Sequence, residues 1–276
     1  MENASFFQQT HVYFRKIRRI AFKEKFWKFI VFAFIVSFLV AAVVGKDMFT
    51  TYESTKSGFF SIASASIWIG VFNSIQNICK EHEIIRAEYR SGMKISSYIT
   101  ATVLWQFILC LIQSVIILGV CYIFIDFNSD GVLMPAMIEY FITIFLMIFG
   151  ADVMGLMISS IAGSPTTAMT IMPFTLILQL IMSGVLFELG KWSEKIAYLT
   201  FSKWGMSAIG SIADFNSDKF PLEISKAFPN VTRLKAEEAY EHTASNVITA
   251  WVCCLGLAFL FYLVSIAALK IKNRDS

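Results

Sequence analysis

The sequence predicts an all-α, polytopic membrane protein, and three observations support this fold class. The chain of 276 residues is 57% hydrophobic and only 16% charged, whereas soluble domains carry about 25% charged residues. Six apolar segments each approach the roughly 20 residues that a helix needs to cross a bilayer. Their apolar character is continuous rather than alternating, which argues against a transmembrane β-barrel and for helices that satisfy their own backbone groups.

The first expected element is a basic, amphipathic helix over Thr10 to Lys28. Apolar side chains recur on one helical face, while Arg and Lys residues occupy the other. This pattern is typical of a helix that lies in the membrane interface. The alternative is a charge cluster that only fixes the topology of the chain. We assign residues 1–28 to a cytoplasmic N-terminal segment with this interfacial helix.

Six transmembrane helices are expected within a membrane domain over residues 29–269, followed by a tail at 270–276. Their places are near Phe26–Val44, Ser57–Ile78, Ile95–Ile125, Pro135–Ile161, Thr166–Phe187 and Asn246–Leu269. A charged, helix-capable segment at about 80–92 separates the second helix from the third and ends at Gly92. Lys and Arg are concentrated in the N-terminal segment, in this loop and in the tail. The positive-inside rule therefore predicts a multi-pass protein of the cytoplasmic membrane with both termini in the cytoplasm.

The long segment at about 188–245 is expected on the external side. Its first part, Glu188–Ile212, mixes aromatic residues with glycines. It is too polar to span the membrane and too apolar for a free loop, so re-entrant helices at the membrane boundary are expected. Its second part, Asp214–Thr243, is polar and contains proline, which indicates an external loop with a helical piece at Leu234–Tyr240.

No motif in the sequence predicts catalysis. There is no GxxxxGK[ST] phosphate loop, no HExxH and no CxxC, so the chain is not expected to be an enzyme or to hold a metal, ATP or another cofactor by these routes. Asp152 is the costly intramembrane carboxyl. It is either satisfied by polar groups of neighbouring helices or part of a cavity or gate. Glu139 is expected near the external boundary, where its carboxylate can reach water.

Polar side chains also cluster at the end of the second apolar segment. Asn73, Gln76 and Asn77 are spaced to share one helix face. They either bond to neighbouring helices or face a translocation cavity.

Two distant stretches carry motifs that occur together in one transporter family. The first is Ala87–Tyr98, read as Ala-Glu-Tyr-Arg-Ser-Gly-Met-Lys-Ile-Ser-Ser-Tyr. The second runs through Ser183-Gly-Val-Leu-Phe, Trp192, Phe201–Ile209 and Ala213-Asp-Phe. In type and order they resemble ABC-2-type permeases of the G subfamily of ABC transporters. The resemblance covers almost the whole chain.

The resemblance implies the transmembrane half of a dimeric ABC exporter. The interfacial helix would be the connecting helix, and residues 80–92 the coupling helix that docks on an ATPase. The ATPase-coupling residues would be Glu81, Glu83, Arg86, Glu88 and Arg90. The second and fifth helices would enclose the substrate across the dimer axis. The cavity would be lined by Ser66, Ile69, Phe72, Asn73, Ile177 and Leu180, and its apolar plug would be Val185 and Leu186.

The resemblance also implies the partners. An ABC ATPase subunit would bind ATP and Mg in place of this chain, and a second permease copy, identical or different, would complete the pathway within membrane lipid. Nucleic acid is not expected. The position near Gln76 is often acidic in relatives and is neutral here, so substrate preferences do not carry over. Two alternatives are an ATPase-independent channel or scaffold, and an ABC-linked sensor or immunity component.

Overall fold

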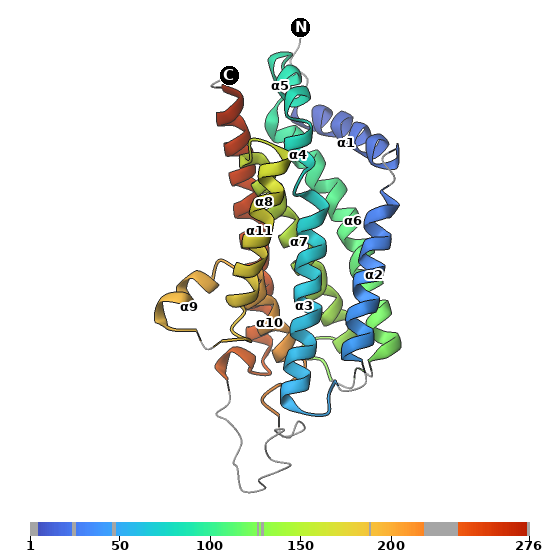
Figure 1. Ribbon diagram of the computed structural model, residues 1–276, viewed down its shortest axis with the longest axis vertical. Helices are drawn as coiled ribbons and strands as arrows, with labels where there is room; N and C mark the ends of the chain where they lie inside the picture. The colour runs from blue at the N-terminus through green and yellow to red at the C-terminus, as the bar shows by residue number, and fades with distance from the viewer. Residues whose placement is uncertain are drawn as a thin grey trace, which may run out of the picture.

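The described part of the chain is an all-α bundle whose long helices run side by side along the long axis of the molecule (Figure 1). The computed structural model describes residues 5–23, 26–45, 48–125, 127, 130–187, 189–217 and 237–274. The helices are α1 (Phe6–Lys23), α2 (Trp27–Val44), α3 (Tyr52–Ser74), α4 (Asn77–Lys80), α5 (His82–Arg90), α6 (Ile95–Phe124), α7 (Ala136–Ile161), α8 (Pro165–Ile181), α9 (Lys191–Ala197), α10 (Phe201–Ile212), η2 (Glu238–Tyr240) and α11 (Ala244–Arg274). The helices α1 and α5 and the last turn of α11 lie at one end, and α10 and η2 lie toward the other (Figure 1).

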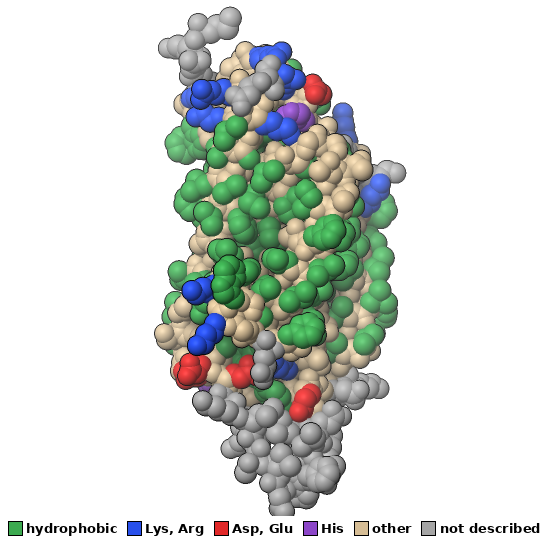
Figure 2. All heavy atoms as spheres, turned by 60° about the vertical axis from the view of Figure 1, so that its left-hand side comes forward, with side chains coloured by type: hydrophobic (Ala, Val, Ile, Leu, Met, Phe, Trp, Pro, Cys, Tyr) green, Lys and Arg blue, Asp and Glu red, His purple; other side chains and the backbone are tan. Residues whose placement is uncertain are grey.

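The apolar helices give the bundle the character of a membrane domain. In the described part of the chain, five helical stretches are long and apolar enough to span: α2, α3 with α4, α6, α7 and α11. Figure 2 shows a hydrophobic, largely uncharged belt around the middle of one face, with many Lys and Arg side chains at the upper end and a few, together with Asp and Glu, at the lower end. The prediction of an all-α, multi-pass membrane protein is confirmed.

The fifth predicted segment is shorter in the structure than the sequence suggests. We expected Thr166–Phe187, but α8 ends at Ile181 and has 17 residues. The hydroxyl of Ser183 accepts a hydrogen bond from the N–H of Val185 (3.2 Å), and Gly184 has a φ of 74°. This left-handed turn, which glycine adopts without strain, ends the helix although the sequence stays apolar.

The centre of the bundle is the close crossing of α3 and α7. A Cβ atom on Gly70 would lie 2.2 Å from the carbonyl oxygen of Ile148, and one on Gly155 would lie 2.5 Å from the hydroxyl of Ser74. Glycines therefore let the two backbones approach, as is common between membrane helices. A second link, between α3 and α6, is the reciprocal amide pair of Asn73 and Gln113, with bonds of 2.7 and 3.0 Å.

The segment before the last helix packs partly into the bundle. α10 packs against α11, α7 and α3, and the ring of Phe201 occupies the space beside Gly150. The N–H of Ser202 donates to Oε1 of Gln179 (3.1 Å), which ties α10 to α8. The shorter α9 stays outside and exposes Trp192. Of the expected helical piece at Leu234–Tyr240, Glu237 and the 3₁₀ turn η2 lie in the described residues; Glu188 and residues 218–236 lie outside them.

The N-terminal helix begins earlier than predicted. It starts at Phe6 rather than Thr10 because Ser5 and Gln8 form a reciprocal capping box: Ser5 N–H donates to Gln8 Oε1 (3.0 Å) and Gln8 N–H to Ser5 Oγ (3.3 Å). On this helix, the ring of Phe14 contacts the ring of Trp105 on α6. The last helix is also longer than predicted, and Lys272 near its end donates to the carbonyl of Ala162 just after α7 (2.6 Å).

Candidate functional site

The charged segment between α3 and α6 forms a helix at the tip of the bundle. α5 ends at Arg90, and Gly92 follows with a φ of 100°. Gly92 N–H bonds to the carbonyl of Tyr89 (3.0 Å) and Met93 N–H to that of Glu88 (3.0 Å). These two bonds are a Schellman motif, which requires a left-handed residue and explains why glycine ends this helix.

One face of α5 is anchored to the bundle. Ile85 is completely buried in a hydrophobic cluster that also contains Leu156 of α7 and Leu269 of α11. Two of the predicted coupling carboxylates also point inward. Glu81 accepts a hydrogen bond from the hydroxyl of Tyr98 on α6 (3.0 Å), and Glu88 pairs with Lys16 on α1 (2.5 Å). These contacts hold α5, α1 and α6 together.

The amphipathic helix α1 is joined to the loop after α5 as well. The side chain of Gln9 donates to the carbonyl of Gly92 (3.3 Å) and accepts from the N–H of Lys94 (2.8 Å). Burial, with the carboxylate of Glu88 nearby, raises the pKa of Tyr13 on the same helix to about 12. The α1–α5 contact is therefore built from both charge and hydrogen bonds.

The opposite face of α5 is open. Glu83, Ile84, Ala87 and Arg90 are exposed, and Ile84 has 52% of its surface accessible. We call these four residues the α5 outer face. Arg86 is half-buried between the two faces. The five predicted coupling residues thus divide into inward Glu81 and Glu88, outward Glu83 and Arg90, and intermediate Arg86. Ile84 is not among the predicted coupling residues, because the sequence alone does not distinguish it from the adjacent, buried Ile85.

The chain does not run straight from α3 into α5. α3 ends at Ser74, and Ile75 and Gln76 connect it to the short α4. The hydroxyl of Ser159 on α7 accepts from the N–H groups of Ile78 (3.0 Å) and Cys79 (3.2 Å). It thereby satisfies two N–H groups that have no partner in the first turn of a helix. We call this connection, at Ile75 and Gln76, the α3–α4 joint.

The joint corrects one prediction. Asn73, Gln76 and Asn77 were expected on one helix face, but the helix is interrupted between them. Asn73 and Asn77 line a cavity beside α6, whereas Gln76 lies at the joint and is not among the residues that line it.

The residues predicted to line a shared cavity fall on different surfaces. Ser66 and Ile69 are fully buried, and Asn73 is bonded to Gln113. Phe72 packs on Phe32 of α2, with ring centroids 5.2 Å apart. On α8, Ile177 is exposed and Leu180 half-buried. This protomer therefore does not bring the α3 set and the α8 set onto one open surface.

A different part of α3 is open. Its outward side chains are Ser57, Ser61, Ser64 and Trp68, of which Ser57 and Trp68 are exposed and the other two half-buried. On α8, which packs beside α3, the apolar side chains Phe174, Ile177 and Ile181 are exposed. We call these seven residues the α3/α8 outer face.

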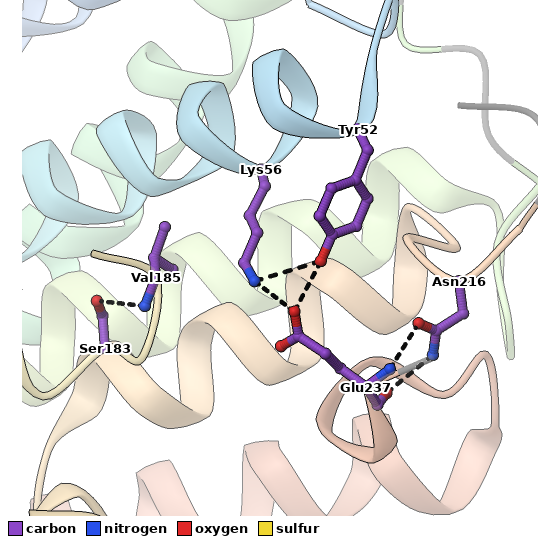
Figure 3. Close-up of polar contacts among 6 residues, drawn as sticks. All are labelled: Tyr52, Lys56, Ser183, Val185, Asn216 and Glu237. Carbon is purple, nitrogen blue, oxygen red and sulfur yellow. Dashed lines mark hydrogen bonds and ion pairs between the residues drawn. The ribbon is translucent and has the colours of Figure 1, made fainter. Parts of the chain in front are cut away.

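The predicted plug lies in the turn after α8. Val185 is half-buried and packs against the core, while Leu186 is exposed. Figure 3 draws the Ser183–Val185 hydrogen bond and, in the same view, a polar cluster made by Tyr52 and Lys56 of α3 and Glu237. In that cluster the hydroxyl of Tyr52 donates to Glu237 Oε1 (2.8 Å).

The backbone of Glu237 is also held by hydrogen bonds. Its N–H donates to Oδ1 of Asn216 (3.1 Å), and its carbonyl accepts from Nδ2 of the same residue (2.8 Å) (Figure 3). The ammonium of Lys56 also lies 5.0 Å from the ring centroid of Tyr240, within the range of a cation–π contact. This cluster joins the first turn of α3 to the segment before α11.

Glu139 differs from expectation, and Asp152 lacks, among the described residues, the neighbouring hydrogen bonds that one of its two alternatives required. Glu139 does not reach water: it is completely buried and accepts from the N–H groups of Val132 (3.0 Å), Leu133 and Met134 (2.9 Å). Asp152 is also completely buried, but neither carboxyl oxygen has a hydrogen-bond partner within the described residues.

The nearby hydroxyl of Ser74 bonds to the backbone carbonyl of Asp152 instead (2.5 Å). Within the described residues, no group of three His, Cys, Asp or Glu side chains is placed to hold a metal ion.

Comparison with known proteins identifies one family. A family model described as ABC-2 type transporter matches residues 7–212. The matched stretch runs from α1 to the end of α10 and includes α5 and the α3/α8 outer face. No curated protein matches the chain.

Proposed function

The chain belongs to the ABC-2 type transporter family and is a permease subunit of an ABC transporter; we propose further that it exports its substrate and is driven by a separate ATPase chain. The α5 end then lies in the cytoplasm and the α10 end outside. The proposal is supported by the distribution of Lys and Arg, which favours the cytoplasmic side at α1, α5 and the end of α11.

The observation that carries the proposal is the division of α5 into an anchored face and an open one. An exposed isoleucine flanked by Glu83 and Arg90 offers a partner an apolar contact surrounded by charges of both signs, which is the composition of an interaction hot spot with a polar rim. We assign ATPase docking to the α5 outer face. Glu81 and Glu88 do not dock; they transmit the motion of α5 to α6 and α1.

A second permease copy packs on the α3/α8 outer face in this proposal. Three apolar α8 side chains and Trp68 are exposed there beside small serines. Serine hydroxyls and close helix contacts favour association within lipid. ATP binding would bring two ATPases together, displace the two α5 helices and change the separation of the two faces. Val185 and Leu186 would close the external end of the pathway between them.

The experiment begins with co-purification in mild detergent. Tagged chain should extract an ABC ATPase, and Ile84→Asp should abolish that association while leaving the fold intact. If wild-type chain extracts no ATPase, the separate-ATPase proposal is wrong and an autonomous channel or scaffold is favoured. Arg274→Gln, at the same end on α11, is the control.

A transport measurement follows in proteoliposomes that contain both subunits. ATP-dependent accumulation of an amphipathic probe on the side opposite the ATPase supports export. ATPase association without transport would favour the sensor or immunity component instead.

A further inference from the structure

A cavity of about 720 Å³ lies inside the protomer at the α5 end of the membrane domain, between α1, α2, α6 and the end of α3 with α4. It shares no residue with the α5 outer face or the α3/α8 outer face. Of the residues that the transport proposal uses, only Glu81 lines it.

The walls of this cavity change from apolar to charged along its length. One end is formed by Phe29 and Phe32 of α2, Phe72 of α3 and Leu109 of α6. The other end includes Lys80 and Glu81, which precede α5. Gln113, one α6 turn beyond Leu109, bonds to the carbonyl of Phe29 (3.2 Å), so the apolar end is level with the first turns of α2, inside the membrane. The cavity therefore changes from apolar to charged in the same direction as the bilayer interface does, from the hydrocarbon core outward.

The charges at the mouth favour an anion. Lys28 and Lys80 line the cavity and are exposed, and within the described residues no carboxylate forms a salt bridge with either. Glu81 also lines the cavity, but one of its oxygens already accepts from Tyr98. Two ammonium groups against one carboxylate leave a net positive charge, which attracts a phosphodiester at a membrane surface.

One residue that lines the cavity has a buried acceptor with no donor among the described residues. Gln106 lines the cavity and is only 2% exposed. Its Nε2 donates to the carbonyl of Asn73 (3.2 Å), whereas its Oε1 has no partner within the described residues. An unpaired buried amide oxygen is unfavourable. A hydroxyl group in the cavity would supply the missing donor.

The surrounding surface is suited to anionic lipid. An open groove on the other side of Phe26 and Trp105 is lined by Arg15, Arg18 and Arg19 of α1. A basic amphipathic helix of this kind concentrates anionic lipid at the interface. The cavity therefore opens where such a lipid is enriched.

We propose that this cavity binds one anionic phospholipid with a hydroxylated head group. Lys28 and Lys80 hold the phosphodiester, a head-group hydroxyl donates to Gln106, and an acyl chain lies along Phe29, Phe32 and Phe72. The lipid fills the space between α1 and the bundle and so supports the helix that is paired with α5.

The test measures bound lipid directly on the full chain, purified in mild detergent and free of added lipid. Native mass spectrometry follows binding of phosphatidylglycerol, phosphatidylcholine and, as the soluble source of the same phosphate chemistry, glycerol 3-phosphate. Wild type should bind one phosphatidylglycerol in preference to phosphatidylcholine. The double variant Lys28→Gln/Lys80→Gln should bind it at least about tenfold more weakly.

The control Lys270→Gln/Arg274→Gln removes two basic residues of α11 that do not line the cavity, and it should bind like wild type. Gln106→Leu should lower the preference for phosphatidylglycerol over phosphatidylcholine. The proposal is overturned if both double variants lose phosphatidylglycerol binding equally, or if wild type binds no lipid. Equal binding of glycerol 3-phosphate overturns the lipid assignment in favour of a simple anion site. None of these readouts requires ATPase or transport, so they are independent of the proposed function.

Discussion

The Nζ atom of Lys56 lies 2.6 Å from Oε1 of Glu237, and this ion pair joins residues that are 181 positions apart in the chain. The side chain of Lys56 is 14% exposed and that of Glu237 is 41% exposed, so water screens the pair only partly. The pair connects α3, which carries the proposed dimer face, to the segment that leads into α11.

Glu237→Gln should lower the free energy of unfolding by about 1 kcal/mol, because Lys56 would remain poorly solvated without its counter-charge. Thermal unfolding in detergent micelles checks this, with Glu238→Gln as the control, since Glu238 is an exposed neighbour. A double-mutant cycle with Lys56→Met isolates the pair. A coupling energy of zero would contradict a stabilising pair.

Truncation of the adjacent residues Ile84 and Ile85 should affect two different properties: stability for Ile85 and ATPase binding for Ile84. Ile85→Ala removes a fully buried side chain and should cost about 2–5 kcal/mol of stability. Ile84→Ala should leave the unfolding midpoint unchanged and weaken ATPase binding at least about tenfold. Unfolding curves and pull-down titrations on the two variants check both effects. Loss of stability in Ile84→Ala would show that this residue packs on the bundle rather than on a partner.

Acidification should loosen the attachment of α5. Burial, followed by the positive charge of Lys272, lowers the pKa of His82 below 6.5, with Arg86 acting in the same direction and Glu83 opposing. The folded protein therefore takes up this proton less readily than the unfolded chain. The stabilising effect is complete above about pH 6.5 and is lost as the pH falls below it.

The measurement is the difference in unfolding midpoint between pH 7.5 and pH 5.5. His82→Gln should show a smaller difference than wild type. An identical pH dependence in wild type and His82→Gln would contradict the assignment.

Gly70→Ala should destabilise the bundle by about 1–3 kcal/mol, because its Cβ would overlap a backbone carbonyl that cannot move aside alone. Gly119→Ala on α6 is the matched control: it is also a helical glycine, but no atom lies within 4 Å of its added Cβ. That substitution should be neutral or stabilising, since alanine favours helix. Comparison of the two unfolding midpoints checks the prediction; equal effects would show that the α3–α7 crossing tolerates a wider spacing.

Several elements could be read from the sequence because one strong local signal defines each of them. Continuous apolarity locates the spans, and Gly92 marks the end of α5. Other features depend on the neighbours of a residue. α3 is apolar over most of its surface, so its pattern could not show that Ser66 and Asn73 turn inward while Ser64 and Trp68 turn outward.

Polar groups were misplaced for a related reason. The sequence showed Glu139 at a helix start but not the chain of residues 132–134 folding over it. The α3–α4 joint could not be predicted either, because its cap, Ser159, lies about 80 positions away. The length of α8 depends on the turn at Gly184, which interrupts an apolar run without any change in polarity.

The α3–α4 joint has a mechanical consequence. α5 is joined to α1 by the Lys16–Glu88 ion pair and, through Glu81 just before it, to α6 by the hydrogen bond from Tyr98, while its Ile85 is buried with side chains of α7 and α11. Between α3 and α5 lie the α3–α4 joint, the short α4 and Glu81, and Ser159 pins α4 to α7. If α5 has the proposed coupling role, its displacement would reach α6 directly through Glu81 and would reach α3 only across the joint, so that α3 could keep its packing against α7.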